Sequence, residues 1–291
     1  MISVFSLGFK GYNALTQLNP AYIPLIDSVV IGRDAGVEND YADELKAWCT
    51  SRTIEHFEKE AADQNLPHSN YILLIGWRWL VKESPDQHFI VLHDSLLPKY
   101  RGFNPLVTAL IEGDSEIGGT AIFAKGAYDT GNIIVQKKVS LVYPCKIQQA
   151  IDLMAKIYLE IVTELFEKIS TGQTLTSRNQ DEKEATYSLW RDQEDYRINW
   201  AQPASRVLRH IHASGSPYKG AFSEAGGFRY RILDAALAED VEIANRTVGK
   251  VIFTRNGNPV IVCQEGLLEL TAIVAENGEK VALPNFRVRL S

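Results

Sequence analysis

Residues 88–102, HFIVLHDSLLPKYRG, combine an apolar run with an abruptly charged end. The run FIVL stops at His93 and Asp94, and a polar segment follows. This pattern is typical of a buried strand with a loop at its carboxyl end. Histidine titrates near neutral pH, so an imidazole at such a position can accept or donate a proton. The stretch therefore predicts a core strand with a reacting group at its end.

Other parts of the first half repeat the strand signature and alternate it with helical patterns. The further apolar runs are ISVFSLG at the start, LIDSVVIG (25–32) and YILLIG (71–76). Strands that alternate with helices predict an α/β fold with a Rossmann-like, mostly parallel sheet. Ligands bind such sheets beyond the carboxyl ends of the strands. The loops expected at that edge are Gly8–Gly11, Gly76–Leu80 and His93–Gly102.

The second half changes character. Apolar residues from Ile147 to Ile169 recur at helical spacing, which predicts one long amphipathic helix packed on the core. The polar segment 171–184, TGQTLTSRNQDEKE, is expected to be a linker. After a short helix around 203–213, β-rich runs alternate with Gly-Gly, Asn-Gly and Glu-Gly pairs, the turns of a small antiparallel barrel.

We therefore expect two domains, residues 1–184 with the functional site and residues 185–291 as a small β-rich, OB-like domain. The net charge of −6 argues against a protein that mainly binds polyanions. The three cysteines are scattered and form no CxxC pair, which suits a reducing compartment. With no basic leader and no long uncharged apolar run, the sequence predicts a cytoplasmic protein without membrane contact.

A second polar turn offers a partner for His93. Asp129 lies in AYDTG (127–131), between the predicted strands 118–124 and 132–142. A single carboxylate in such a turn usually accepts a hydrogen bond from a backbone N–H. If both neighbouring strands belong to the sheet of His93, however, their loops leave near one edge. The carboxylate could then reach the imidazole, fix its tautomer and support its charged form.

Three of these segments resemble one enzyme family. HDSLLPKYRGFNPL (93–106), GDSEIGGTAIF (113–123) and AYDTGNIIVQ (127–136) are similar to the formyltransferases that use N10-formyltetrahydrofolate. The motif of that family runs Asn-x-His-x-Ser-Leu-Leu-Pro and continues to an Asp-Thr-Gly turn. EDYRINW (194–200) and the segments 211–222 and 248–270 resemble the small C-terminal domain of methionyl-tRNA formyltransferase and of several amino-sugar formyltransferases.

The resemblance implies transfer of a formyl group to a primary amine, with N10-formyltetrahydrofolate as cosubstrate and no metal. His93 matches the catalytic histidine of the family and Asp129 its catalytic aspartate. In such a reaction the amine must be neutral to attack, the carbonyl oxygen gains negative charge, and the departing N10 needs a proton. A histidine held by a carboxylate can handle protons at both steps.

One position departs from the motif. Val91 stands where the family has asparagine, whose amide would donate to the developing oxyanion. Losing such a donor typically costs about 10²–10³ in rate. Asn104 is the candidate replacement among the catalytic residues, although the sequence favours an N-cap before Pro105 as its role. The departure also leaves open a homologue that binds folate or a nucleotide sugar without catalysis.

The remaining candidate residues fall into two sets. The resemblance implies a folate side made of Gly76, Trp77, Arg78, Trp79, Leu80 and Tyr128. A pterin needs backbone partners along one edge and apolar cover, yet Trp77 and Trp79 are explained equally as core aromatics. The substrate side consists of Lys10, Ser95, Lys99, Tyr100 and Arg101, with cations that suit phosphates and a serine that supports the loop. A solvated surface position explains Lys10 equally well.

The distribution of charged residues along the chain bears on which amine is the substrate, a tRNA-linked one or a sugar-linked one. Residues 201–291 hold 11 basic and 9 acidic side chains, whereas residues 1–200 hold 19 and 27. This is a poor footprint for tRNA. We therefore expect a nucleotide-linked amino sugar as substrate, for formamido sugars of a surface polysaccharide, and no nucleic acid. The alternatives are methionyl-tRNA formyltransferase and, from the incomplete Gly-x-x-Gly start, a dinucleotide-dependent oxidoreductase. Exposed strands of the small domain offer a route to a homodimer.

Overall fold

The computed structural model describes residues 1–62, 68–81, 84–283 and 287–291. Two compact units make up the chain. The first comprises Met1–Leu106, Glu116–Ser140 and Ala150–Leu189, and the second Val107–Ser115, Leu141–Gln149 and Trp190–Ser291. The second unit thus takes in two short pieces of the first half, and the boundary predicted at residue 184 stays a prediction. In the described ranges, every helix is too short or too polar to cross a membrane.

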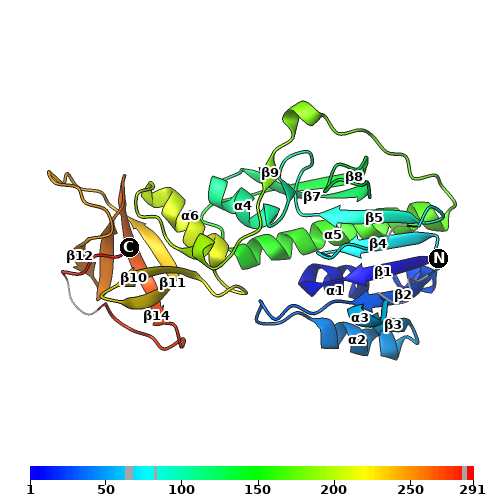
Figure 1. The fold of residues 1–291 in the computed structure, drawn as a ribbon, viewed down its shortest axis with the longest axis horizontal. Coiled ribbons are helices and arrows are strands. Elements are labelled where there is room, and N and C mark those ends of the chain that lie inside the picture. Colours follow the sequence, from blue (N-terminus) through cyan, green and yellow to red (C-terminus); the bar gives the residue numbers. More distant parts are fainter. Residues whose placement is uncertain (63–67, 82–83, 284–286) are drawn as a thin grey trace. The chain divides into compact units, whose positions relative to one another are not determined.

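The first unit is built on a seven-stranded sheet (Figure 1). Its strands are β1 (Ile2–Ser6), β2 (Ile26–Ile31), β3 (Glu55–Glu58), β4 (Tyr71–Ile75), β5 (His88–His93), β7 (Glu116–Phe123) and β8 (Ile133–Ser140). The order is β3-β2-β1-β4-β5-β7-β8, in which the first five strands are mutually parallel and β7 is antiparallel to both of its neighbours, β5 and β8. The predicted α/β fold with a mostly parallel sheet is confirmed.

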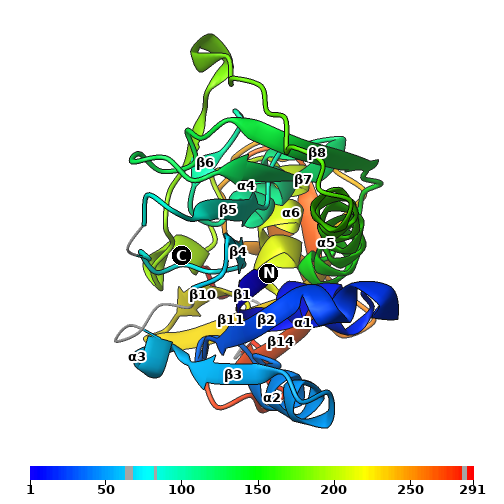
Figure 2. The ribbon, with the colours of Figure 1, turned by 90° about the vertical axis from the view of Figure 1, so that its right-hand side faces the viewer.

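Helices cover this sheet or connect its strands. They are α1 (Gly8–Thr16), α2 (Ala42–Ser51), α3 (Lys59–Ala62), α4 (Pro105–Glu112) and α5 (Ile147–Ser170), with a 3-10 turn at Pro20–Leu25. α1 and α5 lie on the same side of the sheet (Figure 2), where the side chain of Asn13 donates a hydrogen bond to the carbonyl of Ala155. The long amphipathic helix is therefore present as predicted, and its apolar stripe is buried.

A glycine allows α5 to approach the sheet closely. A Cβ atom at Gly119 in β7 would lie 3.0 Å from the Tyr158 ring and 3.1 Å from the side chain of Ile157. Any larger residue there would push the helix away and open a gap, because interiors are packed as densely as organic crystals. The close approach brings Tyr158 down onto the end of the sheet that carries His93, since Thr120 follows Gly119 and pairs with His93.

The polar segment after α5 is not a free linker. Arg178 and Ile133 exchange backbone hydrogen bonds of 2.8 and 2.9 Å, and a short parallel pair joins β6 (Arg101–Gly102) to β9 (Tyr187–Ser188). We call residues 178–188 the strap. Its polar composition suggests a solvated connection, but Arg178, Gln180, Glu182 and Thr186 all form hydrogen bonds with other parts of the sheet unit.

The second unit contains a five-stranded antiparallel sheet in the order β10-β11-β14-β13-β12, packed against helix α6 (Ala204–Ser214). Its strands are β10 (Ala221–Ala225), β11 (Phe228–Ala238), β12 (Val251–Arg255), β13 (Asn258–Val262) and β14 (Leu267–Ala275). The predicted pairs Gly226–Gly227 and Asn256–Gly257 connect neighbouring strands with positive φ at both positions, as tight hairpins require.

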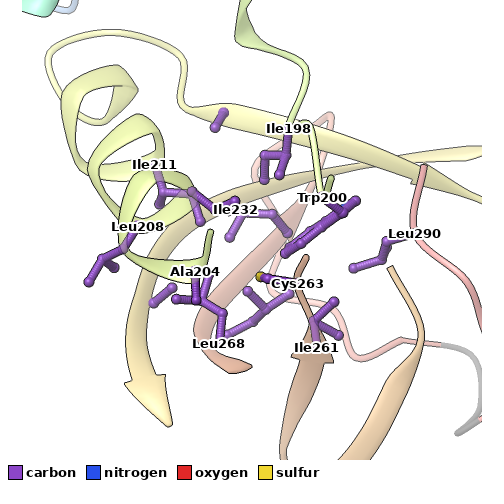
Figure 3. Close-up of a cluster of buried hydrophobic side chains, with 14 of the residues drawn as sticks. Ile198, Trp200, Ala204, Leu208, Ile211, Ile232, Ile261, Cys263, Leu268 and Leu290 are labelled. Atoms are coloured by element: carbon purple, nitrogen blue, oxygen red, sulfur yellow. The ribbon is translucent and has the colours of Figure 1, made fainter. Parts of the chain in front are cut away.

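The core of this unit lies between α6 and the sheet (Figure 3). Trp200 is its largest member, and the indole N–H donates to the hydroxyl of Ser223 at 2.9 Å. The other residues labelled in the figure are Ile198, Ala204, Leu208, Ile211, Ile232, Ile261, Cys263, Leu268 and Leu290. The small β-rich domain predicted from the turn pattern is thus an independent packed core.

Candidate active site

His93 ends β5 and is buried, with 7% of its surface exposed. Its Nε2 atom lies 2.8 Å from the backbone carbonyl oxygen of Tyr100. A carbonyl can only accept, so Nε2 carries the proton in this arrangement. The neutral imidazole therefore presents the lone pair of Nδ1. The expectation that a carboxylate fixes the tautomer is corrected here, because a backbone carbonyl does so.

Asp129 lies on the other side of the imidazole. Its Oδ1 atom is 3.5 Å from Nδ1 of His93, and its Oδ2 atom accepts a hydrogen bond of 2.8 Å from the backbone N–H of Gly102. Asp129 thus satisfies a backbone donor and also faces the histidine, although it does not fix the tautomer. At 3.5 Å the pair is not a formed hydrogen bond. The carboxylate can stabilise an imidazolium without tying up Nδ1.

The route by which Asp129 reaches His93 differs from the prediction. β5 and β7 are antiparallel, so His93 pairs with Thr120 while the end of β7, Phe123, pairs with Ile90. The loop of Asp129 therefore leaves the sheet three residues before His93, which is about 10 Å at roughly 3.3 Å per residue. It must fold back along the sheet to bring the carboxylate to the imidazole.

Gly131 allows the loop of Asp129 to pass close to the backbone of β7 on its way back to the sheet. A Cβ atom at Gly131 would lie 1.6 Å from the carbonyl oxygen of Phe123, so only glycine can follow the aspartate and re-enter the sheet there. Asp129 itself has a φ of 55°, a left-handed conformation that aspartate tolerates better than most residues. The Asp-Thr-Gly sequence is thus explained by the geometry of the turn.

Val91 and Asn104 have different surroundings. Val91 is partly buried and packs against two apolar clusters, one that includes Phe89 and one that includes Ile122. It offers no donor, so the motif asparagine has no counterpart at its own position. Asn104 precedes α4, is exposed, and has a φ of 48°. Its assignment as the replacement donor stays a prediction.

The loop after His93 is held by its own contacts. The hydroxyl of Ser95 donates to the carbonyl of Lys99, which supports the loop as expected for this serine. Tyr100 is buried with a φ of 58°, and its N–H donates to the hydroxyl of Thr186 at 2.9 Å. This strained conformation directs the Tyr100 carbonyl toward His93. Lys99 is exposed, with Nζ 4.6 Å from the Tyr100 ring centroid.

Arg101 is not available to a substrate phosphate in this arrangement. Its side chain is 1% exposed, and the guanidinium donates to both carboxylate oxygens of Glu182 at 2.7 and 2.8 Å. It also donates twice to Oε1 of Gln180. The Glu182 carboxylate raises the pKa of this guanidinium. Arg101 therefore anchors the strap, contrary to its predicted role on the substrate side.

A second charged cluster lies at the same strand end and was not predicted. The Lys10 ammonium forms an ion pair with Asp94, and the Tyr158 hydroxyl donates to the same carboxylate. Nζ of Lys10 is 5.4 Å from the Tyr158 ring centroid. Lys10 is thus neither a solvated surface lysine nor free for a phosphate, since its side chain is 17% exposed and already paired.

Burial and charge act against each other in this cluster. Burial alone would raise the pKa of Asp94, but the Lys10 charge and the hydrogen bonds from Lys10 and Tyr158 hold it below its ordinary value. For Tyr158, burial and then the Asp94 charge raise the phenol pKa well above its ordinary value. The cluster is therefore an ionised carboxylate between an ammonium and a neutral phenol.

The predicted folate loop follows β4. Gly76 has a φ of 64°, and a Cβ atom there would lie 2.6 Å from the carbonyl of Leu7, so the turn requires glycine. Trp77 packs edge-on to Phe5 with ring centroids 5.0 Å apart, and Trp79 packs on Trp77 at 4.9 Å. The contacts of the two tryptophans are thus those expected of core aromatic residues.

Three features of this loop bear on a pterin. The indole N–H of Trp77 is buried and has no hydrogen-bond partner among the described residues. Leu80 is 83% exposed and offers apolar cover, whereas Arg78 is paired with Asp34 at 3.0 Å. Tyr128 is 63% exposed, beside Asp129 in the chain. The loop thus supplies a buried donor without a described partner and an exposed apolar side chain, two kinds of group that a planar heterocycle uses.

Comparisons with known proteins agree with this architecture. A family model described as formyl transferase matches residues 49–160, and one described as formyl transferase, C-terminal domain matches residues 191–289. The chain is a two-domain α/β protein. It has a Rossmann-like sheet with a histidine–aspartate pair beyond one strand, and an antiparallel β domain follows. The chain belongs to the formyltransferase family and carries both of its domains.

Individual relatives show how far the likeness extends. The methionyl-tRNA formyltransferase of Caldanaerobacter subterraneus subsp. tengcongensis is 28% identical over 204 residues, 70% of this chain but 64% of that protein. The chain thus aligns with less than two thirds of that relative's length. Among solved structures, the N-formyltransferase from Helicobacter canadensis has a TM-score of 0.67 at 17% identity, covering 92% of this chain and 98% of that one.

A third likeness is to HypX from Aquifex aeolicus, solved with tetrahydrofolic acid. Its TM-score is 0.59 at 21% identity, covering 97% of this chain and 45% of that one. At such identities the two structural likenesses establish the fold, and the chemistry of this chain has to be argued from its own residues.

Proposed function

We propose that this protein transfers a formyl group from N10-formyltetrahydrofolate to a primary amine. The observation that carries the proposal is the histidine–aspartate pair, with Nδ1 of His93 3.5 Å from the Asp129 carboxylate in a chain of the formyltransferase family. HypX was solved with tetrahydrofolic acid and the Helicobacter canadensis enzyme with folinic acid, which supports a reduced folate as cosubstrate.

The site residues would act on protons. Because Nε2 of His93 donates to Tyr100, Nδ1 is the nitrogen that can take a proton from the attacking amine. The charged imidazole would then be stabilised by Asp129, which lies beside that nitrogen. The same proton can pass to the leaving nitrogen of the folate as the tetrahedral intermediate breaks down. A positioned acid–base group of this kind contributes about 10²–10⁴ in rate.

Folate would lie beside the loop after β4. We propose that Gly76, Trp77, Arg78, Trp79, Leu80 and Tyr128 form this side of the site. The indole N–H of Trp77, which is buried and has no partner among the described residues, is the donor that the ligand would satisfy. In the proposal, the exposed Lys99 stays on the substrate side, whereas Lys10 and Arg101 are assigned to internal ion pairs.

For the amine we propose a nucleotide-linked amino sugar. The net charge of −8 over residues 1–200, from 19 basic and 27 acidic side chains, disfavours an extended tRNA contact. The Helicobacter canadensis enzyme was solved with dTDP-3-aminofucose and aligns over nearly its whole length. We propose formamido sugars for a surface polysaccharide as the product class and the cytoplasm as the compartment.

Methionyl-tRNA is the second candidate substrate. It is favoured by the 28% identity to a methionyl-tRNA formyltransferase, which is higher than the identity to the sugar enzyme. The two candidates make different demands on salt: tRNA binding weakens steeply with ionic strength, whereas recognition of a diphosphate depends on it far less.

A single assay separates these possibilities. The protein is incubated with N10-formyltetrahydrofolate and, in parallel, with dTDP-, UDP- and GDP-linked amino sugars and charged initiator tRNA. Formylation of one sugar class, abolished in His93→Asn, supports the proposal. Formylation of methionyl-tRNA alone would replace the substrate, and tight sugar binding without turnover would identify a binding protein in which Val91 has ended catalysis.

A further inference from the structure

The loop that carries Asp129 leaves the sheet at a point far from His93. It leaves β7 at the level of Ile90, about 10 Å from His93 at roughly 3.3 Å per residue, and has to be held in its folded-back path. A loop of this length without anchors would populate many conformations, because fixing each residue costs backbone entropy. Something must therefore hold the carboxylate opposite the imidazole.

Gln180 in the strap contacts this loop directly. Its Nε2 atom donates to the backbone carbonyl oxygens of Asp129 and Gly131, both at 2.7 Å. The two bonds clamp the loop on either side of Thr130. They hold the left-handed backbone of Asp129, whose φ is 55°, at the point where the side chain turns toward His93.

The other end of the same amide is fixed as well. Oε1 of Gln180 accepts from Nε and Nη2 of Arg101 at 3.1 and 2.8 Å. Arg101 is 1% exposed and is held by Glu182. One side chain thus connects the loop of Asp129 to the segment that contains Tyr100 and Gly102, the two backbone partners of the His93–Asp129 pair.

We propose that Gln180 is a positioning residue that holds Asp129 opposite His93. Its two donors fix the Asp129 backbone, and its oxygen ties that backbone to the buried Arg101. Only a side-chain amide offers both functions in this geometry, because a carboxylate has no donor and an ammonium has no acceptor. The kinetic part of this inference rests on the proposed formyl transfer, and the structural part does not.

Two variants distinguish the hydrogen bonds that the Gln180 amide donates from those that it accepts. Gln180→Glu keeps oxygen acceptors for Arg101 but loses both donors to the loop, and Gln180→Met loses all four contacts with little change in volume. Both should release the Asp129 loop. Gln136→Glu is the matched control, because Gln136 also donates twice, to the backbone carbonyl of Leu97 and to the Thr120 hydroxyl, and accepts from an arginine, Arg178. None of these contacts involves Asp129.

The first measurement is hydrogen exchange of the full chain by NMR. The Gly102 N–H donates to Asp129, whereas the neighbouring Phe103 N–H donates to the backbone carbonyl of Ser188 at 2.9 Å. We expect Gly102 to exchange at least tenfold faster in both Gln180 variants, with Phe103 changing far less. Gln136→Glu should leave Gly102 unchanged. Equal exchange of Gly102 in wild type and Gln180→Glu would overturn the proposal.

The second measurement is a double-mutant cycle in kcat. Gln180→Met should lower kcat by up to about 10²-fold in the wild-type background, the usual effect of a small misplacement. It should lower kcat little further in Asp129→Asn. An equal loss in both backgrounds would mean a general structural role and contradict the proposal. A wild-type chain without formyl transfer would instead refute the proposed function, and the exchange of Gly102 would still decide the role of Gln180.

Discussion

His93 and Asp94 are neighbours at the end of β5 but have opposite surroundings. His93 faces Asp129 across 3.5 Å, with one ring nitrogen free to take a proton. Asp94 is closed by an ammonium and a phenol from α1 and α5. Successive side chains of an extended segment point to opposite sides, so one strand end serves two polar sites.

The two sites differ in whether their charges and hydrogen bonds are paired within the protein. The Asp94 cluster pairs its charge and hydrogen bonds within the protein, as a buried charge must to be tolerated. The pair of His93 and Asp129 leaves a contact longer than a hydrogen bond, which is common for catalytic groups before the substrate arrives. We infer that the Asp94 cluster stabilises the fold and that the pair of His93 and Asp129 is reactive. The variants below test this distinction.

The largest effect is expected from removal of the imidazole. His93→Asn should lower kcat by about 10²–10⁴ while leaving the unfolding midpoint close to that of the wild type. Asp129→Asn should do the same, and the double variant should be hardly worse than either single one, because the two side chains act on one proton. Steady-state formyl transfer and thermal unfolding are the measurements. Additive losses would show that the two residues act separately.

The Asp94 cluster should respond in stability instead. Asp94→Asn leaves the Lys10 ammonium without a counter-charge and should cost about 3 kcal/mol in the free energy of unfolding. Adding Lys10→Met should restore part of that loss, because no unpaired charge then remains. The kcat of the folded variant should change little. A loss of kcat as large as that of His93→Asn would place Asp94 among the reactive groups.

The stability contribution of Asp94 has a defined pH dependence. Its pKa in the folded protein is lowered, so the contribution is complete above the ordinary aspartate value of about 3.9 and is lost as the pH falls through the folded value. The difference in unfolding free energy between wild type and Asp94→Asn should therefore be constant from neutral pH to about pH 5 and shrink below about pH 4. Denaturant unfolding across this range tests the sign.

Val91 provides a smaller test of the reactive side. Val91→Asn restores the motif asparagine but inserts an amide among apolar neighbours, so it should cost about 1–3 kcal/mol of stability without raising turnover. The matched change Val91→Thr introduces a smaller polar group at the same place. A large gain in kcat for the asparagine variant would show that the missing donor limits the natural enzyme.

The elements of the fold could be predicted where hydrophobic patterns are strong. The runs of β1, β2, β4 and β5, the stripe of α5 and the turns of the second unit follow from local sequence alone. β3 was missed because EHFE at the sheet edge is mostly polar, and edge strands do not need an apolar face. The strap has the composition of a linker, and local sequence does not predict its contacts because its partners come from distant parts of the chain.

The site shows the same limit. His93 and Asp129 could be found from the motif, and the structure brings them together, although along a different path from the one expected. Tyr158 falls within the apolar stripe of a helix, where nothing in the sequence distinguishes its hydroxyl from a core ring. Gln180 lies in a polar segment without periodicity. Such contacts depend on tertiary structure, so pattern and spacing do not reveal them.

The smallest effect tests the folate side of the reactive site. Trp77→Phe removes the indole N–H, which has no partner in the described part of the chain, but keeps a ring. It should therefore raise KM for N10-formyltetrahydrofolate by about 2–10-fold, the value of one hydrogen bond. Trp48→Phe is the matched control, because the Trp48 N–H in α2 is also buried and unpaired among the described residues. Both changes remove an unsatisfied donor, but only a donor that meets the ligand affects KM. Equal KM values for the two variants would show that the Trp77 N–H makes no contact with folate.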